Sequence, residues 1–249
     1  MSALVVGEAL GFPNRLAPTR VALDAGELVC LIGPNGSGKT SLLHALAGIG
    51  KPQGMVRIDG IDPWQVPPPR RTALLSYLPA SRDVAWPLAA RDLAMLGLPL
   101  PATGARLAEW VALLKLEHLL ARRVDRLSTG ERSRLLIARA LAADSRLLLL
   151  DEPTANLDPL WQLLLMDSLK RRAETSGCAL LLAVHDLEIA RRYADRLLVM
   201  NKGRIEAQGP PAEIIAGPVI PRIFGIEPGE AGWQLAKSDS TTADPQPSR

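Results

Sequence analysis

LVCLIGPNGSGKTSLLHALAG, residues 28–48, decides the fold of this 249-residue chain. The apolar run 28–32 predicts a strand, the glycine-rich segment 33–40 fits G-x-x-x-x-G-K-[ST], and residues 40–48 have the pattern of a helix. A strand, a glycine-rich loop and a helix in this order form the setting in which the motif cradles phosphates. A chance surface turn would lack this setting, so we expect nucleotide binding here.

The chemistry of the loop explains why these residue types are needed. Glycines let backbone N–H groups turn toward the β- and γ-phosphates, and the helix N-terminus adds a partial positive charge. Lys39 supplies a full positive charge, and the Thr40 hydroxyl is a ligand for Mg²⁺. We therefore expect ATP and Mg²⁺ as cofactors. The residues expected to bind the nucleotide are Gly33, Pro34, Asn35, Gly36, Ser37, Gly38, Lys39, Thr40 and Ser41.

The rest of the chain alternates short apolar runs with segments of helical period. Such runs predict strands buried on both faces of a mainly parallel sheet, and the alternation predicts an α/β doubly wound fold. Residues 54–60 and 201–209 alternate and carry glycines, which favours antiparallel hairpin pieces in a lesser β layer. The predicted strands are 28–32, 147–150, 179–184 and 197–200, and the predicted helices are 40–48, 103–120, 131–143, 160–172 and 187–193.

Length and composition describe one globular unit, which we place at residues 1–236. A chain of this size buries a full core without disulfides, so the two cysteines, Cys30 and Cys178, are expected to be buried and reduced. Residues 237–249 contain too few apolar side chains to offset the entropy of ordering, and we expect this tail to be disordered.

Charge and hydropathy exclude two classes of function. The net charge is +3 and the arginine pairs are scattered, whereas a nucleic-acid surface needs a concentrated basic stripe. No apolar run approaches the roughly 18–20 residues that span a bilayer, and the first ten residues lack the basic start of a signal peptide. We therefore expect neither a secreted nor a transmembrane chain, and no nucleic-acid partner.

The predicted strand 147–150 ends in two carboxylates, Asp151 and Glu152. The carboxyl ends of strands are where open α/β sheets present ligands. We expect Asp151 to hold Mg²⁺ and Glu152 to polarise the water that attacks the γ-phosphate, as a general base. The alternative is that Glu152 is an acid at a helix start, where the helix dipole stabilises negative charge.

Three further segments complete a pattern. LSTGE, residues 127–131, precedes Asp151 by about twenty residues, ANLD occupies 155–158, and His185 follows Glu152 by about thirty residues. Together with GPNGSGKT and LLLLDEP, this set resembles the ATP-binding-cassette (ABC) ATPases over about residues 1–225. The resemblance implies a P-loop NTPase with a mainly parallel sheet, a small antiparallel β subdomain and a helical subdomain inserted at about 81–143.

The resemblance also implies a shared active site. Ser128, Thr129, Gly130 and Glu131 would face the γ-phosphate bound by a second subunit, and Asp158 would lie at the interface. Because the chain carries one copy of each motif, it would supply half of each of two sites, and the simplest closed assembly is a two-fold homodimer with two shared ATP sites.

His185 resembles the family's switch histidine, which contacts the γ-phosphate and orients the water of Glu152. The alternative is that His185 caps the next helix or is satisfied at the strand end.

Two positions depart from the family pattern, and the role of a third is open. Ala80 stands where a glutamine that reaches Mg²⁺ or the attacking water is usual, and water or Ser81 would have to substitute for it. Hydrolysis is still expected because the other catalytic positions are present. Thr129 replaces the usual first glycine of its motif. Phe12 either stacks on adenine or belongs to the core.

The resemblance implies that the ATPase drives separate membrane subunits. Residues 81–101 would form the groove for a helix of such a subunit, with Trp86, Leu88, Leu93 and Met95 as candidate contacts; core packing is the alternative for each. The chain is similar to the ATPases of vitamin B12, iron-siderophore and haem importers. The resemblance thus implies transmembrane permease subunits, a solute-binding protein, and a peripheral location at the cytoplasmic face of the inner membrane. The alternative is a soluble ABC ATPase, or a nucleotide-gated regulatory subunit, that is not coupled to transport.

Overall fold

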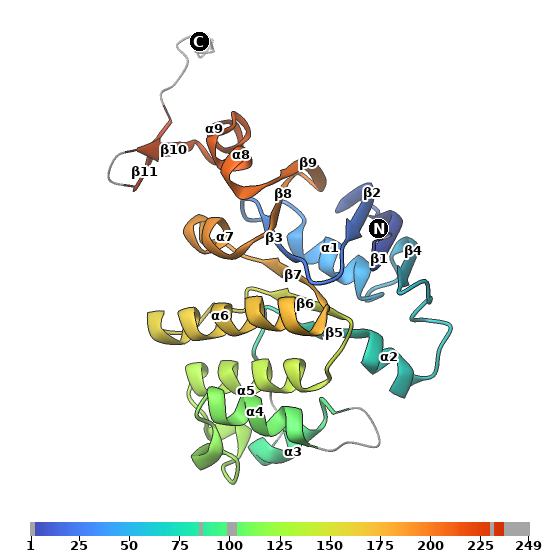
Figure 1. Ribbon diagram of the computed structural model, residues 1–249, viewed down its shortest axis with the longest axis vertical. Helices are drawn as coiled ribbons and strands as arrows, with labels where there is room; N and C mark the ends of the chain where they lie inside the picture. Colours follow the sequence, from blue (N-terminus) through green and yellow to red (C-terminus); the bar gives the residue numbers. More distant parts are fainter. Residues whose placement is uncertain (1–2, 85–86, 99–103, 230–231, 237–249) are drawn as a thin grey trace, which may run out of the picture.

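The structure, a computed structural model, describes residues 3–84, 87–98, 104–229 and 232–236. Its central sheet has six strands in the order β5 (Leu75–Leu78), β6 (Leu147–Asp151), β7 (Ala179–Ala183), β3 (Leu28–Ile32), β8 (Arg196–Asn201) and β9 (Arg204–Gly209). The first five strands are parallel, and β9 pairs antiparallel with β8. The predicted α/β fold with a mainly parallel sheet is confirmed (Figure 1). The tail that was expected to be disordered lies outside the described residues.

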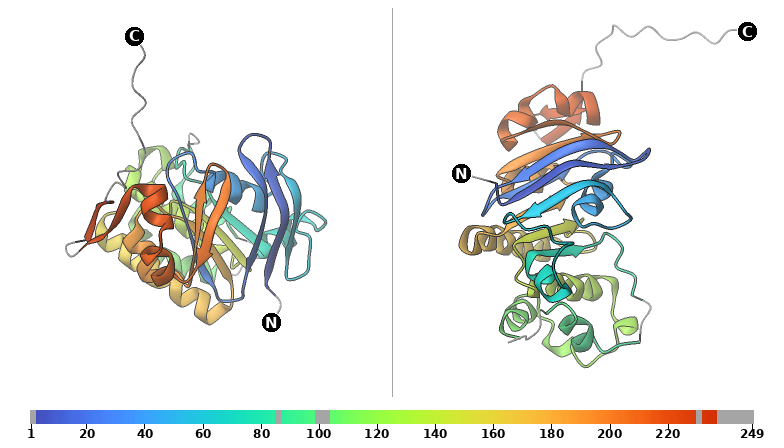
Figure 2. Two further views of the ribbon diagram at one scale, coloured as in Figure 1. Left: turned by 90° about the horizontal axis from the view of Figure 1, so that it is seen from above. Right: turned by 90° about the vertical axis from the view of Figure 1, so that its right-hand side faces the viewer.

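A smaller antiparallel sheet packs beside the central one (Figure 2). Its order is β2 (Leu16–Leu23), β1 (Val5–Phe12) and β4 (Gln53–Ile58), so the prediction of a lesser β layer at 54–60 is confirmed. The prediction that 201–209 joins that layer was wrong. β9 continues the central sheet, because the tight turn at Lys202 and Gly203 returns the chain directly alongside β8.

The two faces of the central sheet carry two separate cores. In β3, Leu28, Cys30 and Ile32 pack with helices α5 (Thr129–Ala142), α6 (Pro159–Ser176) and α7 (Leu187–Tyr193). Val29 and Leu31 pack instead with α1 (Lys39–Leu46) and the antiparallel sheet. Both cysteines are buried free thiols, as expected. Because both faces are covered, the strands are apolar throughout.

Helices lie together at one end of the molecule, between β5 and β6 in the sequence (Figures 1 and 2). α3 (Ala90–Met95) and α4 (Ala105–Leu113) pack on α5, with 3-10 turns at Glu117–Leu119 and Val124–Arg126. The predicted helix over 103–120 was too long. It ends at Leu113 because Lys115 adopts a left-handed conformation, with φ of 50°, that an α-helix cannot contain. The remaining elements are α2 (Pro68–Leu74), α8 (Pro211–Ala216), α9 (Val219–Phe224), β10 (Ile226–Gly229) and β11 (Gly232–Leu235).

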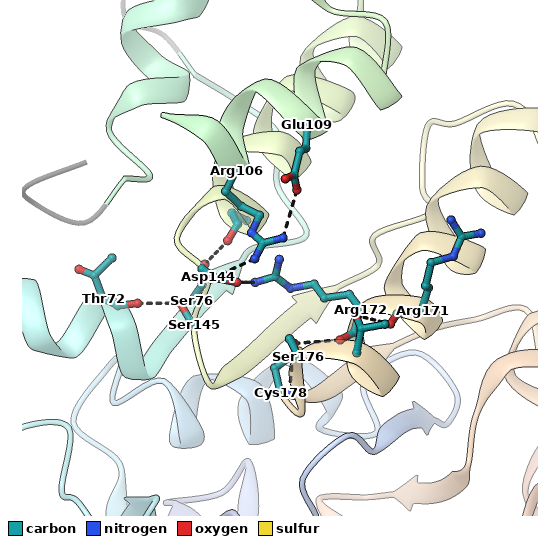
Figure 3. A network of polar contacts seen from close by, with 12 residues as sticks. Thr72, Ser76, Arg106, Glu109, Asp144, Ser145, Arg171, Arg172, Ser176 and Cys178 are labelled. Carbon is teal, nitrogen blue, oxygen red and sulfur yellow. Dashed lines mark hydrogen bonds and ion pairs between the residues drawn. The ribbon is translucent and has the colours of Figure 1, made fainter. Parts of the chain in front are cut away.

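A polar network joins this helical part to the sheet (Figure 3). At its centre is Asp144, in the short connection from α5 to β6. Its carboxylate accepts hydrogen bonds from Arg106 of α4 at 3.3 Å and from Arg172 of α6 at 2.8 Å. The neighbouring Ser145 hydroxyl donates to the Thr72 carbonyl of α2 at 2.6 Å. Three helices from different parts of the chain are thereby tied to one loop.

Candidate nucleotide-binding site

The glycine-rich loop connects β3 to α1 as the motif predicts. A Cβ on Gly33 would lie 2.4 Å from the carbonyl oxygen of Met200, so a side chain has no room there. Gly38 has φ of 104°, in the region that favours glycine, and a Cβ added there would lie close to the Cα of Gly203. Residues 33–38 can thus curl over the N-terminus of α1 and direct backbone N–H groups inward.

Lys39 is buried at the start of α1. Its ammonium donates hydrogen bonds to the carbonyl oxygens of Gly33 at 2.7 Å and Pro34 at 3.2 Å. Burial lowers the pKa of Lys39, while the carboxylates of Glu152 and Asp151 act in the opposite direction. The amine is therefore held within the loop and is available to a phosphate that enters it.

Thr40 and Asp151 form a pair that suits a hard divalent cation. The Thr40 hydroxyl donates to Oδ2 of Asp151 at 2.8 Å, while Oδ1 of Asp151 is buried and has no hydrogen-bond partner. Burial raises the pKa of Asp151, and the Thr40 hydrogen bond partly offsets this rise. A hydroxyl, a carboxylate oxygen without a partner, water and phosphate oxygens make up the oxygen-rich set that Mg²⁺ prefers. The residues present therefore fit Mg²⁺.

Glu152 and His185 lie against each other at the mouth of the site. Nε2 of His185 is 2.5 Å from Oε1 of Glu152, and both side chains are partly exposed. Helix α6 begins only at Pro159, so Glu152 is not at a helix start, and the N-cap of α7 is Asp186, so His185 does not cap that helix. The third alternative, a histidine satisfied at the strand end, fits the contact of His185 with Glu152. Both side chains line the same cleft.

The cleft around these residues has a volume of about 790 Å³. Residues 35–41, Glu152 and His185 line it. So do residues 12–18, around the β1–β2 turn, and residues 202–204, at the β8–β9 turn. Apart from Phe12, the sequence analysis did not consider these two segments for the site. Phe12 borders this cleft and packs against the core of the small sheet, so its expected place in the core is confirmed and its stacking on adenine stays a prediction. Lys202 and Arg204 add positive charge beside the phosphate loop.

The LSTGE segment lies elsewhere on the surface. Ser128 is the N-cap of α5, in a capping box in which its hydroxyl accepts from the Glu131 N–H at 3.3 Å and the Glu131 carboxylate accepts from the Ser128 N–H at 2.8 Å. Asp158 likewise caps α6 through the Trp161 N–H. Within the described chain, residues 128–131 and Asp158 do not line the nucleotide cleft. Their exposed helix N-termini are open to a second molecule.

Sequence analysis also missed Arg82, which is buried next to Asp151 and Glu152. Its guanidinium donates to the carbonyl oxygens of Asp151 and Glu152, each at 3.1 Å. The nearby Ala80 is exposed, and the Ser81 hydroxyl bonds to Asp83 instead of pointing at the site. No motif signals Arg82, because its partners are seventy positions away in the sequence.

Comparison with known proteins agrees with this geometry. Residues 16–155 match the family described as ABC transporter. The hemin import ATP-binding protein of Myxococcus xanthus is 36% identical over 238 residues, which cover 90% of this chain and 89% of that protein. The petrobactin import ATP-binding protein of Bacillus anthracis is 36% identical, with 83% and 80% covered. A dimeric ATP-binding cassette in a post-hydrolysis state with ADP and Pi superposes with a TM-score of 0.72 at 25% identity, with 83% of this chain and 98% of that chain covered.

The fold and the site together define a P-loop ATPase. The chain belongs to the ABC transporter family, in which it is an ATP-binding and ATP-hydrolysing subunit. Among the described residues, no helix has the length and apolar character to cross a bilayer.

Proposed function

We propose that the chain is the motor subunit of an importer for a metal-chelate-type cargo, of the class of haem, iron-siderophore or vitamin B12. The observation that carries this proposal is the similarity over at least 80% of each chain to proteins named for hemin and petrobactin import. The motor would lie at the cytoplasmic face of the membrane, on separate permease subunits served by a solute-binding protein. Nucleic acid is not among the proposed partners.

In the proposed reaction, water attacks the γ-phosphorus and ADP leaves. Residues 33–41 bind the phosphates, with Lys39 balancing their charge. Thr40 and Asp151 would hold Mg²⁺, which supplies charge neutralisation at the β- and γ-phosphates when bound. Glu152 would accept the proton of the attacking water. His185, whose Nε2 lies 2.5 Å from Oε1 of Glu152, would orient that water and contact the γ-phosphate.

The second proposal concerns assembly. We infer a homodimer in which Ser128, Thr129, Gly130 and Glu131 of each subunit complete the ATP site of the other, with Asp158 at the interface. The absence of 128–131 from the cleft lining of the described chain supports this arrangement. So does the exposure of Ser128 and Thr129 at the N-terminus of α5, since a helix N-terminus attracts negative charge.

A groove of about 660 Å³ is the proposed seat of the permease helix. It runs between the end of β5 and helices α3 and α5, and Leu93, Leu96 and Arg139 are among its lining residues. Leu93 is buried, whereas Met95 and Leu96 are exposed beside the groove. Trp86, which the sequence suggested as a contact, lies outside the described residues. Met95 and Leu96 are the side chains we expect a membrane subunit to cover.

The proposal is tested by purifying the tagged chain from its own membranes in mild detergent. We expect a polytopic membrane protein to accompany it, and the ATPase rate to respond to a cargo-loaded solute-binding protein. Recovery from the cytosol, alone or with soluble partners, would favour the soluble ABC ATPase instead.

Roles within the site are tested separately with the purified chain. Glu152→Gln should retain ATP binding, lose turnover and trap an ATP-dependent dimer. Lys39→Ala is the matched control, which should lose ATP binding itself. Wild-type turnover in the Glu152→Gln variant would remove Glu152 as the base.

A further inference from the structure

Arg82 is placed unusually for a positively charged side chain. It lies in the loop that leaves β5 for the helical part, and only 5% of its surface is exposed. Its Nη2 donates to the carbonyl oxygens of Asp151 and Glu152, both at 3.1 Å. Burying a guanidinium costs free energy unless its charge and hydrogen bonds are matched. The two hydrogen bonds to these carbonyl oxygens therefore set the position of the Arg82 side chain.

The backbone that Arg82 holds is strained. Glu152 has φ of 51°, a conformation that residues with a side chain rarely adopt. The Glu152 N–H donates to the carbonyl oxygen of Ala183 in β7 at 3.0 Å, which holds one side of the residue. Arg82 holds the other side through the carbonyl oxygens. Strain of this kind persists only where the surroundings enforce it.

The direction of the Glu152 side chain follows from this backbone. In the observed conformation its carboxylate reaches Nε2 of His185 at 2.5 Å. If the peptide relaxed, the carboxylate would leave that position, and a displacement of about 1 Å in a reacting group can cost about a hundredfold in rate. Arg82 contacts the main chain and not the cleft, so its influence on catalysis passes through Glu152.

We propose that Arg82 is a positioning residue for Glu152, clamping the two carbonyl groups that aim the general base. Nε and Nη1 of Arg82 are buried without hydrogen-bond partners, which costs stability. A side chain that served only to fill this space would therefore be apolar. Burial lowers the pKa of Arg82, and the negative charges of Asp151 and Glu152 act in the opposite direction. The inference rests on the proposed role of Glu152 as base.

The test uses Arg82→Met, which keeps an unbranched apolar side chain and removes the guanidinium, and Arg82→Lys, which keeps the charge. We expect kcat to fall about a hundredfold in Arg82→Met and about tenfold in Arg82→Lys, because the lysine ammonium lies one atom closer to the main chain than Nη2 and reaches the two carbonyl oxygens less well. KM and the affinity for ATP, measured with a fluorescent ATP analogue, should change less than twofold. Arg172→Met is the matched control, since Arg172 is a buried arginine far from the cleft, and its kcat should stay unchanged.

A double-mutant cycle separates positioning from packing. Arg82→Met should not lower the residual rate of Glu152→Gln further, because both changes act through one carboxylate. Wild-type kcat per ATP-binding site in both Arg82 variants would overturn the proposal. So would an equal fold-loss of kcat when Arg82→Met is added to the wild-type protein and to Glu152→Gln. If Arg82→Met does not fold, Arg82→Lys and its combination with Glu152→Gln decide the question. Full activity of Glu152→Gln alone would refute the role of Glu152, independently of Arg82.

Discussion

Asp144 offers a quantitative test of how the helical part is attached to the sheet. Its partner Arg172 has a side chain that is 6% exposed, whereas the side chain of Asp144 is 48% exposed. Asp144→Asn removes the charge, keeps the shape and tolerates the left-handed φ of 52° at this position. The substitution therefore removes both ion pairs of Asp144, with Arg172 and with Arg106, that Figure 3 shows.

The magnitude lies between two limits. An exposed ion pair contributes at most about 1 kcal/mol, and removal of one partner of a fully buried pair costs about 3–5 kcal/mol. With one partner buried and the other half exposed, we expect a loss of about 2 kcal/mol, because the Arg172 charge stays buried while its carboxylate partner is gone. For a chain of this length that loss lowers Tm by about 4–8 °C.

The assay is urea and thermal unfolding followed by circular dichroism. Arg106→Ala is the control, because Arg106 is half exposed and its loss should cost no more than about 1 kcal/mol. Asp144→Asn combined with Arg172→Met should recover most of the stability, since no unpaired charge is left buried. A change in Tm below 1 °C for Asp144→Asn, or additive losses in the double variant, would refute the argument.

Three further perturbations test the site and the core. Ala80→Gln should raise the ATPase rate or leave it unchanged, because Ala80 is exposed and a glutamine has room there; a clear fall would mean that the site is built around the small side chain. Ser128→Ala should destabilise α5 by about 1 kcal/mol through loss of the capping box and weaken the ATP-dependent dimer of Glu152→Gln in gel filtration; an undiminished dimer would argue against the shared site. Burial, reinforced by the charge of Asp195, raises the pKa of the Cys30 thiol to about 12. Ellman's reagent at pH 8 should therefore label neither cysteine until guanidinium is added, and rapid labelling of the native protein would contradict the buried core. This pKa in the folded protein exceeds the ordinary value of 9.0, so the contribution of Cys30 to the free energy of unfolding is complete below pH 9 and is lost as the pH rises toward 12. Cys30→Ala should reduce this dependence of stability on pH.

The fold was predictable where its signals are local. The run 28–32, the glycine-rich loop and the following helix are neighbours in sequence, and strands buried on both faces are apolar throughout, so β3, β6, β7 and β8 could be assigned from their composition. Strands β1 and β2 were missed, because each has only one apolar face. Glu152 was found through its place at the end of a strand and His185 through the family resemblance, and the structure brings them into contact.

Sequence alone was enough for the strands β3, β6, β7 and β8 and for the glycine-rich loop between β3 and α1, since each is encoded in a contiguous segment. Only the packing of the folded chain shows that β9 joins the large sheet and that the β8–β9 turn borders the cleft. The same holds for the hydrogen bonds of Arg82 with the Glu152 carbonyl and of Arg172 with Asp144. Arg82 meets Glu152 across seventy residues and Asp144 meets Arg172 across twenty-eight. The physical reason is that a charged side chain looks the same in sequence whether it is solvated or buried. Only the packing of distant elements removes its water and selects its partner.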